Sequence, residues 1–198
     1  MKNPSRLHIA AVIYGLFAVV AVVWRDALGA SALHDGAPLA GTHAIALPLS
    51  ASLGALTGVV AGAVSRALAR GPRWGQGLYL ALRDALASTP RDRATLVGLT
   101  VAAAIGEELF FRGALLPTLR DSHGVVVAVM ASSLGFGLLH APWSRRMIPW
   151  SVMAAVMGVV FSALYLITGE VLAPMIAHAV VNHENLGFLL DRERPTKP

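Results

Sequence analysis

Residues 94–116 read ATLVGLTVAAAIGEELFFRGALL, a nearly unbroken apolar run that nevertheless contains three charged side chains. A helix rises about 1.5 Å per residue, so about 20 apolar residues cross the hydrocarbon core of a bilayer. This stretch is long enough to do so and predicts a transmembrane helix. Charged side chains at membrane depth are costly, and a functional role is their default interpretation.

Five further apolar stretches predict membrane spans, at 7–24, 44–64, 125–140, 148–168 and 171–190. With 94–116 they predict an all-α fold, a polytopic membrane helical bundle of about six transmembrane helices. The composition agrees, because 56% of the 198 residues are hydrophobic and only 14% are charged, about half the usual charged share. This composition excludes a disordered chain and an ordinary water-soluble enzyme, and the lack of cysteine excludes disulfides and thiol nucleophiles. We expect one integral-membrane domain over residues 1–198.

The basic residues predict the orientation in the membrane. With a cytoplasmic N-terminus, most of the sixteen Lys and Arg fall on the cytoplasmic side, within 2–6, 66–93, 145–146 and 192–197. This asymmetry predicts an N-in, C-in protein. It also explains the net charge of +5 by contact with the lipid bilayer, so we expect no nucleic-acid partner.

Two local patterns predict how helices sit and pack. Between the second and third spans, Trp74, Leu78 and Leu82 recur every four residues, which predicts an amphipathic helix at the membrane interface over 72–88. Small residues recur every four positions in two spans, which favours close helix packing. They are Gly54, Gly58 and Gly62 in the second span, and Ala154, Gly158 and Ser162 in the fifth.

The charges of the third span divide into a pair and a spare carboxylate. Glu108 and Arg112 are four residues apart, with the acid on the N-terminal side, which favours an ion pair on one helix face. Glu107 points about 100° away and is not used by that pair. It is therefore available as a general base facing a cavity.

Two later spans carry imidazoles at helical spacing. Phe136 and His140 share a face at the end of the fourth span, and His178 and Asn182 share one in the sixth. Two adjacent donors suit an oxyanion hole, and Glu107 with His140 could bind and deprotonate a water. Each residue alone has a structural alternative, since an intramembrane His often only bonds a neighbouring helix; the joint set indicates amide hydrolysis in the membrane.

Together these residues resemble the three motifs of the CAAX-protease and bacteriocin-processing (CPBP, or Abi) family of intramembrane endopeptidases. The matching motifs are Glu107-Glu108-x-x-x-Arg112, Phe136-x-x-x-His140 and His178-x-x-x-Asn182. The resemblance covers about residues 94–190, which we take as the catalytic core. It implies that Glu107 and His140 activate water, that His178 and Asn182 stabilise the oxyanion, and that Glu108 and Arg112 hold the site together. Phe136 would pack beside it.

Two chemistries are compatible with such a site. In a glutamate-type protease no metal is used, whereas a metalloprotease would hold zinc with Glu107, His140 and His178. The chain lacks His-Glu-x-x-His, and an Asn beside His178 suits an oxyanion donor better than a ligand. The metal-free chemistry, with no cofactor, is therefore favoured, and zinc remains the alternative.

The substrate would be a membrane-associated protein or peptide, and the membrane would be a bacterial inner membrane. Other hypotheses are a transporter or proton relay that uses the intramembrane Glu and His, or a non-catalytic membrane scaffold. In the N-in topology Glu107 lies about 20 Å from the cytoplasmic end of its span, while His140 ends the fourth span near the cytoplasm. The site can form only if the third span starts later, the fourth continues past Pro142, or the helices tilt strongly. We expect a buried cavity that opens toward the cytoplasm.

Overall fold

The computed structural model of the chain describes residues 5–34, 46–86, 93–140 and 145–191. Over these ranges the chain forms helices and no strand, apart from an isolated bridge between His34 and Glu170. The helices are α1 (Ser5–Ala27), α2 (Leu47–Arg70), α3 (Arg73–Leu86), α4 (Arg93–Glu108), the π-helical segment η2 (Leu109–Leu115), α5 (Leu116–His123), α6 (Val125–Leu139), the short η3 (Arg145–Met147), α7 (Ile148–Thr168) and α8 (Leu172–Asp191).

The predicted helical membrane bundle is confirmed. Four helical segments are long and apolar enough to cross a membrane, namely Ile9–Ala27, Leu47–Arg70, Ala94–His123 and Ile148–Thr168. The fourth predicted span, α6, has only 15 residues, and α8 has 20 residues but carries polar side chains along its length. Thus four of the roughly six predicted spans meet both criteria, and the N-in, C-in orientation remains a prediction.

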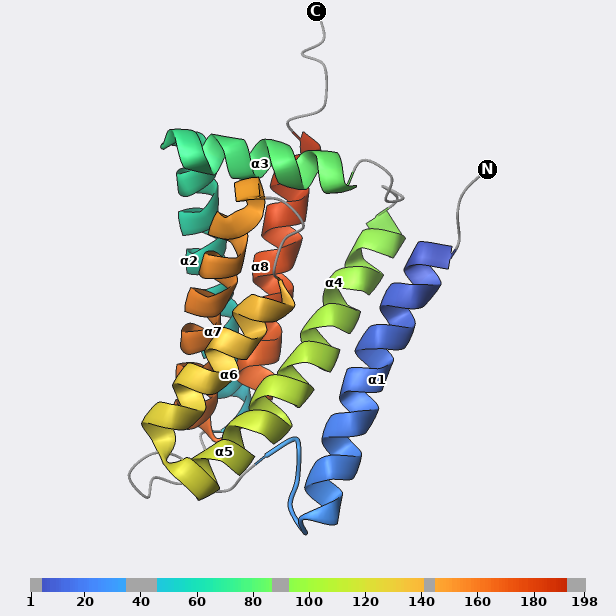
Figure 1. Ribbon diagram of the computed structural model, residues 1–198, viewed down its shortest axis with the longest axis vertical. Coiled ribbons are helices and arrows are strands. Elements are labelled where there is room, and N and C mark those ends of the chain that lie inside the picture. Colours follow the sequence, from blue (N-terminus) through green and yellow to red (C-terminus); the bar gives the residue numbers. More distant parts are fainter. Residues whose placement is uncertain (1–4, 35–45, 87–92, 141–144, 192–198) are drawn as a thin grey trace, which may run out of the picture.

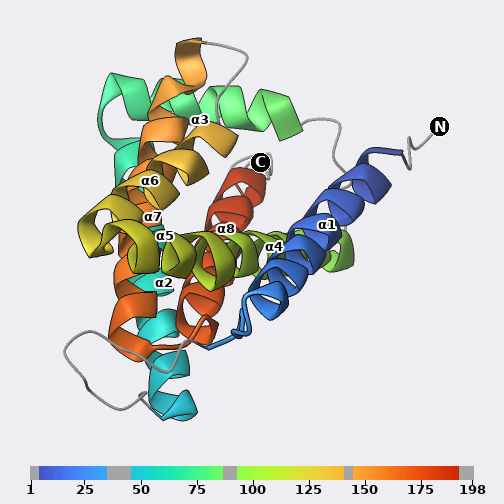
Figure 2. The same ribbon diagram turned by 60° about the horizontal axis from the view of Figure 1, so that its bottom comes forward.

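The bundle is arranged around α8. This helix contacts α2, α4 and α7, and it lies between them in Figures 1 and 2. Helix α1 packs on the other side of α4, at the edge of the bundle. Helices α1 and α4 run obliquely to α2 and α7 (Figure 1). The polar helix α8 is therefore the one most enclosed by other helices, which keeps its polar groups away from lipid.

Small residues allow α2 to approach α8 closely, as the sequence predicted. A Cβ atom added to Gly54 would lie 2.3 Å from the carbonyl oxygen of Ala173, and one added to Gly58 would lie 2.6 Å from Cβ of Val180. The small residues of α7 act in the same way toward α6. A Cβ at Gly158 would lie 2.9 Å from Cα of Ser133. Because no larger side chain separates them, the backbones of the two helices come into van der Waals contact, and the dispersion attraction between them stabilises the packing.

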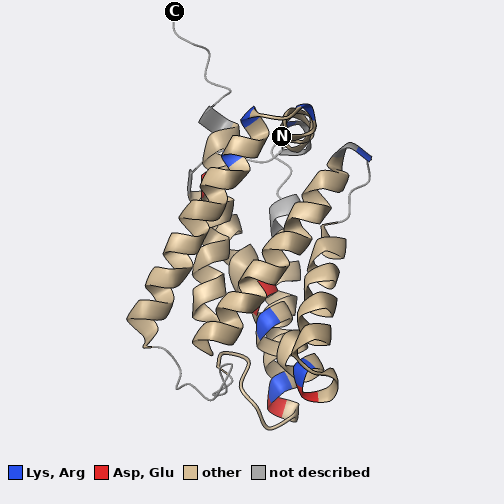
Figure 3. Ribbon diagram, turned by 90° about the vertical axis from the view of Figure 1, so that its left-hand side faces the viewer, with Lys and Arg blue, Asp and Glu red and all other residues tan. Residues whose placement is uncertain are grey.

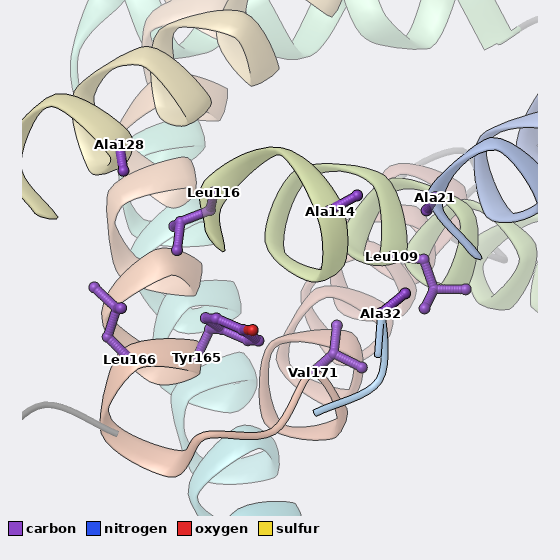
Figure 4. Packing of buried hydrophobic residues seen from close by; sticks show 9 residues of the cluster. All are labelled: Ala21, Ala32, Leu109, Ala114, Leu116, Ala128, Tyr165, Leu166 and Val171. Carbon is purple, nitrogen blue, oxygen red and sulfur yellow. The ribbon is translucent and has the colours of Figure 1, made fainter. Parts of the chain in front are cut away.

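An apolar cluster joins the helices at the end of the bundle opposite α3. Figure 4 shows its members, which are Ala21, Ala32, Leu109, Ala114, Leu116, Ala128, Tyr165, Leu166 and Val171. They come from α1, η2, α5, α6, α7 and the segments beside α1 and α8. The cluster therefore fixes the continuous helix α4–η2–α5 against α7 and the start of α8.

Helix α3 lies across the opposite end of the bundle (Figure 1). Leu78 and Tyr79 are buried on its inner side, while Trp74 stays 46% exposed. A helix thus occupies most of the range 72–88, and residues 87–88 lie outside the described part of the chain. Its position at a membrane interface remains a prediction.

Candidate active site

Charged residues gather at the two ends of the bundle, with one further group in its interior (Figure 3). That group comprises Glu107, Glu108 and Arg112, which are 4%, 0% and 0% exposed. The two acids end α4, and the arginine lies in η2, where the helix widens to π geometry. Such π segments are rare and are frequent at functional sites.

Glu108 is the centre of a buried ionic network. Nη1 of Arg112 donates to both of its carboxylate oxygens at 2.9 Å, and Nη2 of Arg112 donates to the carbonyl oxygen of Gly158 at the same distance. Nδ1 of His178 lies 2.8 Å from Oε1 of Glu108. The carboxylate therefore connects Arg112 with an imidazole on α8, a contact that the sequence pattern did not predict.

Aromatic rings enclose this network. The Arg112 guanidinium lies 4.6 Å from the ring centroid of Phe136 and 5.4 Å from that of Phe161. The His178 ring stacks on Phe161, with centroids 5.2 Å apart, and Phe136 also contacts the ring of His140 at 4.8 Å. Phe136 therefore touches both imidazoles and the guanidinium, and its ring keeps water from the ion pair, whose strength depends on exclusion of water.

Glu107 faces the two imidazoles instead. Its Oε2 lies 4.0 Å from Nε2 of His140 and 3.9 Å from Nε2 of His178. This oxygen is buried and has no hydrogen-bond partner among the described residues. A carboxylate, two imidazole nitrogens and a small space between them are thus brought together from α4, the end of α6 and α8.

Hydrogen bonds on the far side of each ring define which nitrogen faces Glu107. Nδ1 of His140 lies 2.8 Å from the carbonyl oxygen of Phe136, which can only accept, so Nδ1 carries the proton. Nδ1 of His178 likewise donates to Glu108, whose carboxylate pairs with Arg112. In neutral rings both Nε2 atoms are therefore acceptors that point toward Glu107.

Helix lengths and tilt explain how these groups meet. About 24 Å of helix separates Glu107 from His123 at the end of α5, and α6 returns over about 22 Å before it ends beside His140. The two arms of this hairpin are nearly equal, so His140 returns to the level of Glu107. Helix α4 begins at Arg93 and α6 ends at Leu139, so the third span does not start later than predicted. Helix α4 instead runs obliquely to α2 and α7 (Figure 1).

A cavity of about 260 Å³ opens beside these groups. Glu107, His140, His178 and Asn182 all line it, and α3 covers it with Trp74 and other residues. A second, mostly apolar space of about 720 Å³ lies between α2 and α7. His140, His178 and Asn182 line that space as well, so the two spaces adjoin at these residues.

Several further cavity residues were not singled out from the sequence. Among them are Tyr14 on α1, Trp150 on α7 and Asn185 on α8. Asn185 follows Asn182 by three residues, so helical spacing could have found it. Tyr14 and Trp150 lie on other helices, and no spacing relates them to the motifs.

Glu107 lies slightly farther from His140 and His178, the other residues that a metalloprotease would use for zinc, than ligands of one zinc ion lie from each other. Ligands of one tetrahedral zinc lie about 3.3 Å apart, because each is about 2.0–2.1 Å from the metal. The separations of 3.9 and 4.0 Å between Glu107 and the two imidazoles are larger. No group of three or more His, Asp or Glu within the described ranges is arranged to hold a metal ion.

The fold and the cavity define the class of protein. It is a helical membrane protein with buried acid and imidazole groups beside an apolar groove. Residues 90–183 match the sequence model of a family described as type II CAAX prenyl endopeptidase Rce1-like. This segment contains all three motifs and is similar to that family, within the CPBP group, so the resemblance of the motifs is confirmed. Comparison with curated proteins and with solved structures gives no significant match. The chain is thus an integral membrane protein with a segment similar to a protease family.

Proposed function

We propose that this protein is an intramembrane endopeptidase of the glutamate type, with Glu107 as the general base. One observation carries the proposal, the approach of the Glu107 carboxylate to Nε2 of both His140 and His178 within a buried cavity. Among the described residues, no hydrogen bond satisfies the buried Oε2 of Glu107. A water between these groups would therefore find acceptors for both of its protons.

Activation of the water follows from these acceptors. The water donates one proton to Glu107 and the other to Nε2 of His140, and its oxygen faces the substrate carbonyl. As the oxygen attacks the carbonyl carbon, its proton moves to Glu107. When the C–N bond breaks, Glu107 returns this proton to the leaving amine nitrogen, so the enzyme ends the cycle unchanged.

Stabilisation of the oxyanion is assigned to His178 and Asn182. Asn182 supplies a neutral N–H donor to the cavity. His178 already gives its Nδ1 proton to Glu108, so its Nε2 donates only in the doubly protonated ring. The Glu108 carboxylate contacts this ring and would compensate such a positive charge.

The substrate would be a membrane-associated protein or peptide. The apolar groove between α2 and α7 supports this proposal, because His140, His178 and Asn182 line both the groove and the cavity beside Glu107. An apolar segment of the substrate could remain in the bilayer while the scissile bond enters the cavity. We place the enzyme in the inner membrane of a bacterium.

The test uses purified protein reconstituted in liposomes with a panel of membrane-anchored peptides. Mass spectrometry of the products identifies any cleaved bond. We expect cleavage by the wild type and a loss of about 10²–10⁴ in kcat for Glu107→Gln, His140→Ala and His178→Ala. Asp121→Asn removes an exposed carboxylate outside the cavity and serves as the matched control.

Three results would contradict the proposal. Folded Glu107→Gln protein that cleaves as fast as the wild type would exclude Glu107 as the base. Solute or proton flux that depends on Glu107, without cleavage of any peptide, would favour the transporter over the protease. A folded protein that shows neither peptide cleavage nor flux would favour the non-catalytic membrane scaffold.

A further inference from the structure

Tyr14 is a polar side chain in the middle of the apolar helix α1. It lies outside residues 90–183, the segment that carries the family match. Its neighbours Val12 and Leu16 are 69% and 57% exposed on the outer surface of the bundle, whereas Tyr14 turns inward. There it lines the same cavity as Glu107, His140 and His178.

Close contact between α1 and α4 fixes the position of this tyrosine. A Cβ atom added to Gly106 would lie 2.4 Å from the carbonyl oxygen of Tyr14 and 2.9 Å from its Cα. Such distances do not occur between real atoms, so glycine is required at this approach. Gly106 immediately precedes Glu107, so this close contact of the two helices lies beside the proposed base.

The groups around Glu107 are rich in acceptors and poor in donors. Its buried Oε2 has no hydrogen-bond partner in the described part of the chain, and both neighbouring Nε2 atoms are acceptors in neutral rings. The Tyr14 side chain lines the same cavity as Glu107. The Tyr14 phenol adds a neutral O–H donor to these acceptors.

We propose that Tyr14 is a positioning residue whose hydroxyl donates a hydrogen bond, directly or through one water, to the Glu107 carboxylate. The bond holds the carboxylate in the orientation that accepts a proton from the attacking water. The role rests on the proposed function of Glu107. It assigns to α1 a part in the chemistry that lies outside the three motifs.

Tyr14→Phe removes only the hydroxyl and tests this role in the liposome assay. We expect kcat to fall about 10- to 100-fold while KM is unchanged, because the bond acts on the base and not on substrate binding. Tyr165→Phe is the matched control, since it removes a hydroxyl from the apolar cluster outside the cavity. It should leave both constants unchanged.

A double-mutant cycle separates positioning from a structural effect. In the Glu107→Gln background, single-turnover rates should show no further loss from Tyr14→Phe, because its partner is already removed. Gly106→Ala, which displaces Tyr14 from α4, should lower kcat. In the Gly106→Ala background, Tyr14→Phe should cause no further loss of rate.

An unchanged kcat in Tyr14→Phe, or an equal loss in the Glu107→Gln background, would overturn the role of Tyr14 and leave the proposed function intact. Undiminished cleavage by Glu107→Gln itself would instead overturn the proposed function, and this inference with it.

Discussion

Nδ1 of His178 lies 2.8 Å from Oε1 of Glu108, the same carboxylate that holds Arg112. One acid thus neutralises a buried arginine and orients an imidazole of the cavity. The two functions can be separated by mutation, since the first concerns stability and the second concerns activity.

Loss of either member of the ion pair should destabilise the bundle. Glu108→Ala and Arg112→Ala each leave an unpaired buried charge, so we expect each to lower the free energy of unfolding by about 3–5 kcal/mol. The double variant Glu108→Leu/Arg112→Met should recover much of this stability but remain inactive, because His178 loses its partner. Thermal unfolding in detergent and the cleavage assay measure the two effects. A double variant as active as the wild type would show that Glu108 does not orient His178.

Close packing of α2 on α8 should depend on Gly54. Gly54→Ala places a methyl group against the backbone of Ala173, and we expect it to cost about 1–3 kcal/mol of stability. Gly98→Ala in α4 is the control, because an added Cβ there meets nothing within 4 Å. Comparison of their unfolding midpoints decides the prediction, and equal midpoints would contradict it.

The membrane orientation can be tested without background labelling, because the chain has no cysteine. With the N-terminus in the cytoplasm, Gln76→Cys on α3 should react with a membrane-impermeant maleimide only from the cytoplasmic side. Ser122→Cys at the end of α5 should react only from the opposite side. Labelling of both positions from one side would refute the predicted topology, whereas exchange of the two sides would invert it.

Cleavage should persist in protein that contains no zinc. The separations of Glu107 from the two imidazoles exceed those of ligands on one zinc ion, and this geometry supports a metal-free reaction. Metal content of active protein, measured by mass spectrometry before and after chelator treatment, decides the question. Activity that disappears with the metal and returns with added zinc would establish the metalloprotease alternative.

Much of the fold could be predicted from the sequence, because bilayer thickness sets the length of an apolar helix. Two of the predicted spans do not meet both criteria for crossing a membrane. Helix α8 does not meet the hydropathy criterion, because polar side chains such as His178 and Asn182, which line the cavity, lower its mean hydropathy. Helix α6 is short because it ends at the depth of the site, beside His140.

The candidate site could be predicted only in part. Helical spacing suggested which residues share a face, such as His178 with Asn182, but not what that face contacts. The bond from His178 to Glu108, the cover that α3 forms over the cavity and the presence of Tyr14 in it all connect separate helices. No periodicity within one helix contains this information.

By itself, therefore, the sequence determined that the chain is a helical membrane bundle and which rare polar residues are exceptional within it. These properties depend on the free energy of transferring side chains from water to lipid. Each residue and its neighbours in sequence determine that free energy. Only the tertiary structure decided that Glu108 serves two partners and that Glu107 faces two imidazoles. Those relationships depend on the tilt, length and close packing of helices that glycines such as Gly106 and Gly54 permit.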